Sequence, residues 1–222
     1  MSQIRKWRSS PRSPLVYGLS VLGGAVGVTA LALGLGVVCD LDELSDRKAL
    51  VLSLPDTTRA APGAPAILDG RIAASVPVLH DEFVAYRREQ NARRGWDYLD
   101  GGKQPLTVDT GAKIYSIANA DYEFDRSVIG WGHQQRNDEP PTLSTGGVRI
   151  EGLIANGPVT AIGELVGGEE AQRFRARSIV GLSRTAYAER LSQALTLKWQ
   201  IAGGFAVLAV LGLVIGWRGV WR

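Results

Sequence analysis

The feature that most constrains this chain is a stretch without any charged residue, Pro14 to Cys39, close to the N-terminus. As a helix rising ~1.5 Å per residue, about 25 such residues reach ~37 Å, which exceeds the ~30 Å hydrocarbon core of a bilayer. A second uncharged stretch, Ile201 to Trp217, lies close to the C-terminus. The sequence therefore predicts two membrane spans, and the residues between them must lie on one side of the membrane.

Two other interpretations of the first stretch are less favourable. A signal peptide has an apolar region of about 7–15 residues, and this stretch is far longer. A lipoprotein would carry its lipid on Cys39, but Val38 stands before it, where a small residue is expected. The sequence favours a span that is not cleaved.

Basic residues at the two ends predict the orientation. The middle of the chain holds all 22 acidic residues, whereas the short flanks of the spans carry only basic charges. Short basic flanks stay in the cytoplasm. We therefore expect a two-pass protein of the cytoplasmic (inner) membrane, with both termini cytoplasmic and the central domain periplasmic. The residues that set this topology are Arg5, Lys6, Arg8, Arg12, Arg218 and Arg222. The aromatic residues expected at the membrane interfaces are Trp7, Tyr17, Trp199, Trp217 and Trp221.

Small residues form a ridge on the first span. Gly23 and Gly27 make a GxxxG pattern, and Ala30 and Gly34 extend it along one helix face. Such a ridge lets another helix approach closely. We expect this face to bind a partner subunit, with the chain's own second span as the other possible neighbour.

These features divide the chain into consecutive parts. Residues from Ser183 onward repeat apolar side chains at helical spacing, and no Gly or Pro interrupts them before Gly203, so this helix should run directly into the second span. The predicted parts are a basic tail (1–13), transmembrane helix 1 (14–39), an acidic segment and linker (40–65) that includes a short helix, an extracytoplasmic β domain (66–182), a juxtamembrane helix (183–199), transmembrane helix 2 (200–217) and a second tail (218–222).

The central domain has the pattern of short strands. Ala66 to Val78 is apolar but broken by Asp69-Gly70, and Glu82 to Gln90 alternates. Asp109-Thr110-Gly111 and Asn156-Gly157 are hairpin signals between apolar runs. The fold class is thus an α+β membrane protein, with two transmembrane helices bracketing a small β-rich sandwich or barrel.

One long segment, Gly130 to Gly147, has no periodicity and is expected to be a loop. Loops of this length in compact domains are usually functional or disordered. It carries Trp131 and His133, and we expect Trp131 to contact a partner on the outer side of the membrane.

The residues for catalysis or metal binding are sparse. One cysteine and two histidines cannot supply the four ligands of a zinc finger. His80-Asp81-Glu82 fits a polar turn before a strand better than an acid–base cluster, and Asp121, Glu123 and Asp125 fit a solvated edge better than a cation site. Neither span contains a charged residue or a histidine, which disfavours transport and axial haem ligation. We predict no catalytic residue, metal or cofactor, and no nucleic acid partner, because basic and acidic residues are interleaved.

Several motifs resemble a known family. They are Gly70-Arg71-Ile72, Val84 to Arg87, Pro105 to Ile114 and Asn156 to Leu165, and together they cover roughly residues 66–168. This pattern between two spans resembles the GIDE/BAM ("beside a membrane") domain of the mitochondrial ubiquitin ligase family and its bacterial relatives. Phe83-Val84-Ala85-Tyr86 lacks the cysteine usual in the family's tyrosine motif, and the sequence shows no RING. The resemblance therefore implies fold and topology, and it does not imply ligase activity.

The function predicted from these observations is that of a non-catalytic accessory or scaffold subunit. It would bind other transmembrane subunits of a larger complex, of respiratory or photosynthetic type, as well as membrane lipids. The alternative is a stand-alone regulatory or stress-response protein of the GIDE/BAM type. A hydrolase that uses His80 and carboxylates is the third and least favoured class.

Overall fold

The computed structural model describes residues 14–92, 95–125, 142–145, 147–166 and 172–221. The chain forms two compact units. The first, which we term the helix pair, comprises Met1–Glu43 and Leu195–Arg222. The second, which we term the β unit, comprises Leu44–Ala194.

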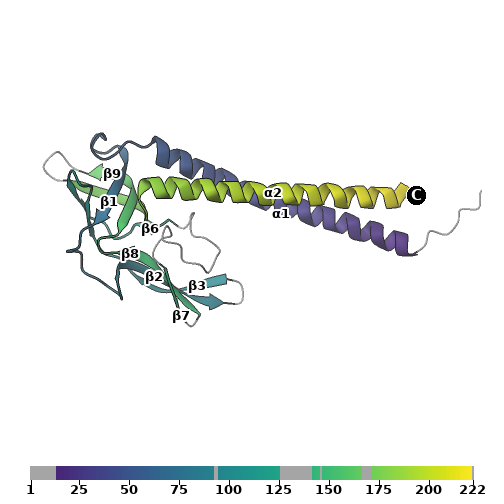
Figure 1. Ribbon diagram of the computed structural model, residues 1–222, viewed down its shortest axis with the longest axis horizontal. Helices are drawn as coiled ribbons and strands as arrows, with labels where there is room; N and C mark the ends of the chain where they lie inside the picture. The colour runs from purple at the N-terminus through teal and green to yellow at the C-terminus, as the bar shows by residue number, and fades with distance from the viewer. Residues whose placement is uncertain (1–13, 93–94, 126–141, 146, 167–171, 222) are drawn as a thin grey trace, which may run out of the picture. The chain divides into compact units, whose positions relative to one another are not determined.

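Two long helices stand at the ends of the element order: α1 (Pro14–Ser53) precedes the first strand and α2 (Arg184–Trp221) follows the last, as the colours of Figure 1 show. Each is long and apolar enough to cross a membrane, with windows of mean hydropathy 2.2 and 2.0. The acidic segment after Cys39 does not form a separate short helix, since it continues α1 to Ser53. No Gly or Pro stands between Cys39 and Pro55 to break the helix. As expected, α2 runs without a break through Gly203.

Five strands of the β unit close into a barrel. They are β1 (Pro65–Ile72), β4 (Leu106–Asp109), β5 (Ile114–Ile117), β9 (Pro158–Val166) and β10 (Arg173–Val180). Their order is β5-β4-β1-β9-β10, and β5 also pairs with β10, which completes the ring. The β5–β10 pair is parallel and the other four are antiparallel. A short strand, β6 (Glu123–Phe124), continues this sheet beside β10. Of the two predicted architectures, sandwich and barrel, the barrel is therefore correct for these five strands.

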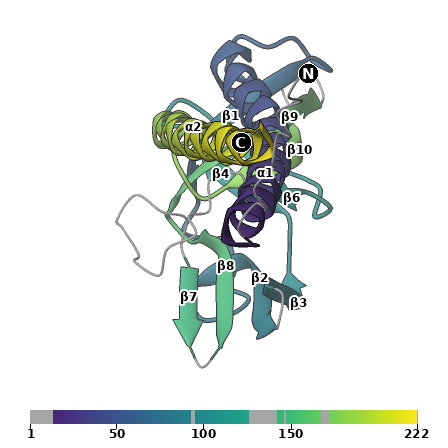
Figure 2. The same ribbon diagram turned by 90° about the vertical axis from the view of Figure 1, so that its right-hand side faces the viewer.

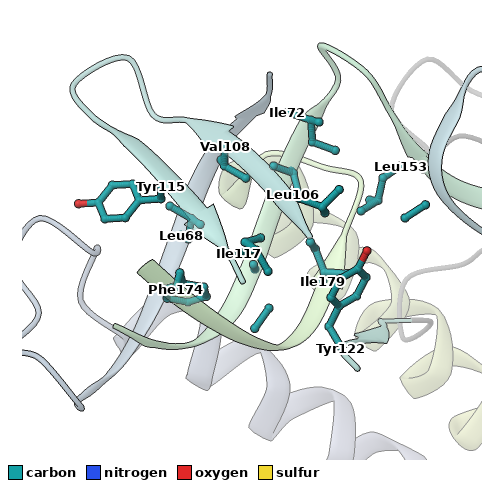
Figure 3. Packing of buried hydrophobic residues seen from close by; sticks show 14 of the residues in the cluster. Leu68, Ile72, Leu106, Val108, Tyr115, Ile117, Tyr122, Leu153, Phe174 and Ile179 are labelled. Atoms are coloured by element: carbon teal, nitrogen blue, oxygen red, sulfur yellow. The ribbon is translucent and has the colours of Figure 1, made fainter. Parts of the chain in front are cut away.

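The barrel core is built from alternate residues of its strands. The exposed and buried positions of β10 alternate from Arg173 to Ala176, as expected for a strand with one face on a core. Fully burying an aliphatic or aromatic side chain is worth about 1.5–3 kcal/mol, so this cluster is the main source of stability. Figure 3 shows its larger members, which include Leu68, Ile72, Leu106, Val108, Tyr115, Ile117, Tyr122, Leu153, Phe174 and Ile179.

Four strands that lie between the barrel strands in the chain form a second sheet. Its order is β3 (Gly95–Gly102), β2 (Phe83–Ala92), β8 (Val148–Ile154) and β7 (Thr142–Thr145), all antiparallel. Figure 2 shows these four strands side by side. The hairpin of β2 and β3 lies between β1 and β4 in the chain, and β7 and β8 lie between β6 and β9. Two separate insertions therefore assemble one sheet.

Two turn signals in the sequence do not produce the chain break or the hairpin expected from them. Asp69-Gly70 lies inside β1 and does not interrupt it. A Cβ on Gly70 would stand 2.4 Å from the carbonyl oxygen of Asp109, so only glycine permits β4 to approach this closely. Asn156-Gly157 does form a turn, but β8 and β9 do not pair with each other. The N–H of Asn156 instead donates to the carbonyl of Ile72, 2.9 Å away, and this bond ties the turn to the end of β1.

Other predictions of local structure are mixed. The hairpin at Asp109-Thr110-Gly111 is confirmed, with Asp109 opposite Ile114 and Gly111 at φ 80°. The predicted loop Gly130 to Gly147 is partly wrong, because Thr142–Thr145 forms β7 and pairs with β8. Pairing with the long strand β8 supplies backbone hydrogen bonds to a segment that has no periodicity of its own.

Candidate functional site

The glycine ridge of α1 faces α2 within the helix pair. A Cβ on Gly23 would stand 2.9 Å from the Ile215 side chain, and one on Gly27 would stand 3.0 Å from the backbone nitrogen of Leu213. Gly212 completes the contact from α2, since its Cβ would lie 2.7 Å from the Gly23 carbonyl oxygen. Gly212 approaches backbone atoms too closely for any side chain, and a side chain at Gly23 or Gly27 would force atoms of α2 to shift.

The rest of the ridge follows the same face. Ala30 is buried, and a Cβ on Gly34 would be 3.4 Å from the Cβ of Phe205, an ordinary contact. Gly24 and Gly36, by contrast, have open space at their Cβ positions. The structure therefore brings Gly23, Gly27 and Gly34 of the predicted ridge to the chain's own second helix, and Ala30 is buried. Their binding to another subunit stays a prediction.

The remaining surface of the helix pair is apolar and uncovered. Leu22, Val28 and Leu35 of α1 are each more than 60% exposed. On α2, the side chains of Val207, Val210 and Leu213 are each exposed by about half or more. Only 17% of each apolar window is buried. An aliphatic surface of this extent is typical of sites that contact lipid or other protein.

Polar groups and aromatic residues are found near the ends of the two apolar stretches. Lys198 pairs with Asp40 across the two helices at 2.8 Å. Trp199 and Trp217 are 63% and 68% exposed, as an interfacial anchor would be. The structure describes no side chain for Tyr17, Arg218 and Trp221, and Trp7, Arg5, Lys6, Arg8, Arg12 and Arg222 lie outside the described residues.

Arg184, the first residue of α2, caps the end of α1 within the β unit. Its Nε donates to the carbonyl oxygen of Val51 at 3.0 Å, and its Nη2 donates to those of Leu52 and Leu54 at 3.2 and 2.9 Å. Its Nη1 pairs with Asp56 at 2.6 Å. The last carbonyls of a helix lack partners inside the helix and carry a partial negative charge, so a guanidinium satisfies both needs.

Asp125 connects both helix ends to the barrel. Its carboxylate lies 3.1 Å from Nε of Arg47 on α1 and 3.4 Å from the Ser178 hydroxyl of β10. It also accepts a short hydrogen bond from the Tyr187 hydroxyl of α2. The carboxylate is almost completely buried, and burying a charge is costly unless it is paired. Asp125 is thus held by three different elements.

Some apolar residues of the β unit are buried without belonging to the barrel core cluster. They come from the helix ends, from β1 and β9, and from the segment before α2. These buried residues are Leu44, Val51, Ile67, Ile162, Leu182 and Leu191. The β unit also includes about three turns of α2, Arg184 to Ala194, and the last turns of α1, Leu44 to Ser53.

A buried carboxylate organises the second sheet. Glu89 is 1% exposed and pairs with Nε of Arg87 at 2.8 Å and with Arg149 at 2.6 Å. The Arg149 guanidinium also lies 4.6 Å from the centre of the Trp96 ring, and that of Arg87 lies 5.1 Å from the Tyr98 ring. Each arginine thus combines an ion pair with a cation–π contact.

Of the two polar segments, His80–Glu82 forms the expected turn before β2, whereas the expected solvated edge is wrong for Asp125, which is buried and paired. His80 and Asp81 are 3.3 Å apart in a tight turn, with Asp81 at φ 49°, and the His80 ring packs on Tyr86. Asp121 and Glu123 are exposed while Asp125 is buried, so the three do not converge. Among the described residues no group of three His, Cys, Asp or Glu is placed to hold a metal ion. Trp131 and His133 lie outside the described residues.

Two titratable groups of the β unit, Tyr122 and Asp121, have shifted pKa values. Burial raises the pKa of Tyr122 to about 12, although its hydroxyl donates to the carbonyl of Gln104. The hydrogen bond from Asn119 lowers the pKa of Asp121, and the nearby charge of Arg175 adds to this effect. The same Asn119 amide pairs with both the N–H and the carbonyl of Ala176, as a neighbouring strand would.

Sequence reasoning missed the residues that hold the β unit together. Arg184, Asp125 and Glu89 carry no motif, because each acts through partners far away in the chain. The one available signal was Arg184 itself, a cation at the start of a helix, where the dipole disfavours positive charge. Its position indicates that the side chain has an anionic or carbonyl partner elsewhere.

Comparison with known proteins gives no assignment. The chain matches no protein-family model, no curated protein and no solved structure. The GIDE/BAM resemblance thus stays a prediction, and the function must be argued from the two units themselves.

Proposed function

We propose that this chain is a two-span membrane protein and acts as a non-catalytic accessory or scaffold subunit of a larger membrane complex. The single observation that carries the proposal is the uncovered aliphatic surface of the helix pair, on both α1 and α2. Lipid covers part of such a surface in a bilayer, and the transmembrane helices of other subunits cover the rest. We place both termini in the cytoplasm, with the β unit on the outer side of the inner membrane.

The non-catalytic role is supported by what the buried charges of the β unit do. Asp125 joins α1, α2 and β10, Arg184 caps α1, and Glu89 joins β2 and β8. Each is held in contacts that fix the fold. We therefore assign these groups to stability, and the contribution of the β unit to the complex is a binding surface.

Purification in a mild detergent tests the proposal. We expect the protein to come with a stoichiometric set of membrane subunits that remains associated through size-exclusion chromatography. A chain that elutes alone at all detergent concentrations would refute the accessory role.

A reporter experiment tests the topology. A reporter fused after Arg222 should be active in the cytoplasm, and one inserted between Ala61 and Pro62, in an exposed turn, should be active outside. The reverse pattern would contradict the orientation and place the β unit in the cytoplasm.

One observation favours a second function, a stand-alone regulatory or stress-response protein of the GIDE/BAM type. The ridge that we expected to bind a partner lies against the chain's own α2, through Gly27 and Gly212. A chain whose closest helix packing is internal needs no second subunit for it. The elution of the protein alone, with an intact membrane span, is the result that supports this function.

A further inference from the structure

A row of arginines lies on the outer face of β10. Arg173, Arg175 and Arg177 are exposed at alternate positions, while Phe174 and Ala176 between them are buried in the barrel core. Successive side chains of a strand point to opposite faces, so the three guanidinium groups share one outer surface. A β-bulge between Ala176 and Ser178 places Arg177 at the end of the row.

Exposed aliphatic side chains lie beside this row. Arg173 is opposite Ser116 of β5 on one side and opposite Val166 of β9 on the other. Val166 is 43% exposed, and Ile114, two residues before Ser116 on β5, is 60% exposed. The surface therefore combines positive charge with apolar contact area, a composition typical of protein interfaces that are rich in arginine.

Among the residues that the structure describes, acidic side chains balance only one of the three charges. Arg175 lies 4.0 Å from Glu164, at the limit of an ion pair. Its positive charge also helps to lower the pKa of Asp121. Arg173 and Arg177 form no ion pair with any residue that the structure describes. Like charges two positions apart on a strand are about 7 Å apart and repel each other, so the row favours an anionic group above it.

We propose that the outer face of β10 binds an extended acidic segment of a partner protein, whose alternate carboxylates pair with Arg173, Arg175 and Arg177. This inference rests on the proposed accessory role and names the chemistry of its partner. An extended peptide repeats its side chains every ~6.6–6.8 Å on one face, which matches the spacing of Arg173 and Arg175 in the regular part of β10. Arg177 follows at the β-bulge, on the same exposed side. A guanidinium binds a carboxylate through two parallel hydrogen bonds, which gives the contact its direction.

The experiment uses the full chain in nanodiscs of phosphatidylcholine. The probe is a fluorescein-labelled peptide of five Glu-Thr repeats, and a peptide of five Gln-Thr repeats is its uncharged counterpart. Fluorescence anisotropy measures the Kd of each. The variant is Arg173→Glu with Arg177→Glu, and the matched control is Lys48→Glu with Arg59→Glu, which changes the net charge equally at basic positions without a described side-chain partner.

We expect the wild type to bind the glutamate peptide at least about tenfold more tightly than the glutamine peptide. The double variant should weaken binding by about fivefold or more, as expected for the loss of two exposed charge pairs. The control should stay within about twofold. The milder pair Arg173→Gln with Arg177→Gln should give an intermediate loss, which separates an effect on binding from a failure to fold.

Two outcomes would overturn the inference. Equal losses in the variant and the control would show a response to net charge alone. Loss of peptide binding by the wild type in discs with phosphatidylglycerol, at constant ionic strength, would show that anionic lipid occupies the surface. The proposed function is tested separately, because purification with native subunits can succeed while the peptide fails to bind, and then only the assignment of this surface is wrong.

Discussion

The contacts of Arg184 with α1 permit a quantitative prediction. In Arg184→Ala the carbonyls of Val51, Leu52 and Leu54 lose their donor. A hydrogen bond contributes a net 0.5–1.5 kcal/mol or so, which gives about 3 kcal/mol for the three. The pair with Asp56 adds at most about 1 kcal/mol, because half of that carboxylate is exposed to solvent. We therefore expect the end of α1 to lose about 3 kcal/mol of protection against local opening.

Hydrogen exchange followed by mass spectrometry measures this opening directly. A loss of about 3 kcal/mol corresponds to roughly 100-fold faster exchange for the amides of residues 48–54. Arg184→Lys should give an intermediate rate, because an ammonium keeps the charge but cannot reach three carbonyls at once. Arg59→Ala is the matched control, since Arg59 is exposed and makes no described side-chain contact. A change of less than about threefold in Arg184→Ala would show that this cap does not stabilise the helix end.

Three further predictions concern other parts of the chain. Gly27→Leu should destabilise the helix pair by about 1–3 kcal/mol through overpacking, as measured by thermal unfolding. Gly24→Leu should be neutral, because its Cβ position is open. Equal effects of the two substitutions would contradict the packing of Gly27 on α2. Because the folded pKa of Tyr122 is about 12 and the unfolded value is about 10, its contribution to stability should be complete below pH 10 and fall as the pH rises towards 12. Tyr122→Phe should remove that part of the pH dependence in denaturant titrations, and an unchanged alkaline profile would refute the assignment. Glu89→Gln should destabilise the second sheet by about 3 kcal/mol, because two arginines lose their carboxylate, and limited proteolysis should then cleave β2 or β8; cleavage at the wild-type rate would contradict it.

Local patterns in the sequence predicted the features that depend on local chemistry. Uncharged stretches of bilayer length indicated two helices of the kind that can cross a membrane, and short apolar runs with turn signals indicated the strands. The hairpin after Asp109 followed from its turn residues, because Gly111 adopts a positive φ that other residues avoid. For these elements the determining interactions lie within a few residues.

Pairing between distant segments could not be predicted in the same way. Asn156-Gly157 gives the correct turn, yet whether the flanking strands pair depends on β1, β2 and β10, which compete for the same edges. Likewise, Asp125 resembled one member of an acidic edge until the structure placed Arg47 and Tyr187 beside it. Residues separated by 60 or more positions in the chain determine these sites, and no local period reports them.

The topology of the barrel also imposes a delay during synthesis, because β1 is made well before its main partner β9. Strand β1 pairs over most of its length with β9, for example Asp69 with Thr160, and only at its end with β4. A ribosome adds about 5–20 residues per second, so β9 follows β1 by about 5–18 s. During that interval the apolar residues Ile67 and Leu68, both fully buried in the folded chain, have no strand to pair with. The nascent chain should therefore depend on a chaperone that binds extended apolar segments, and it should need that chaperone most between the emergence of β1 and that of β9.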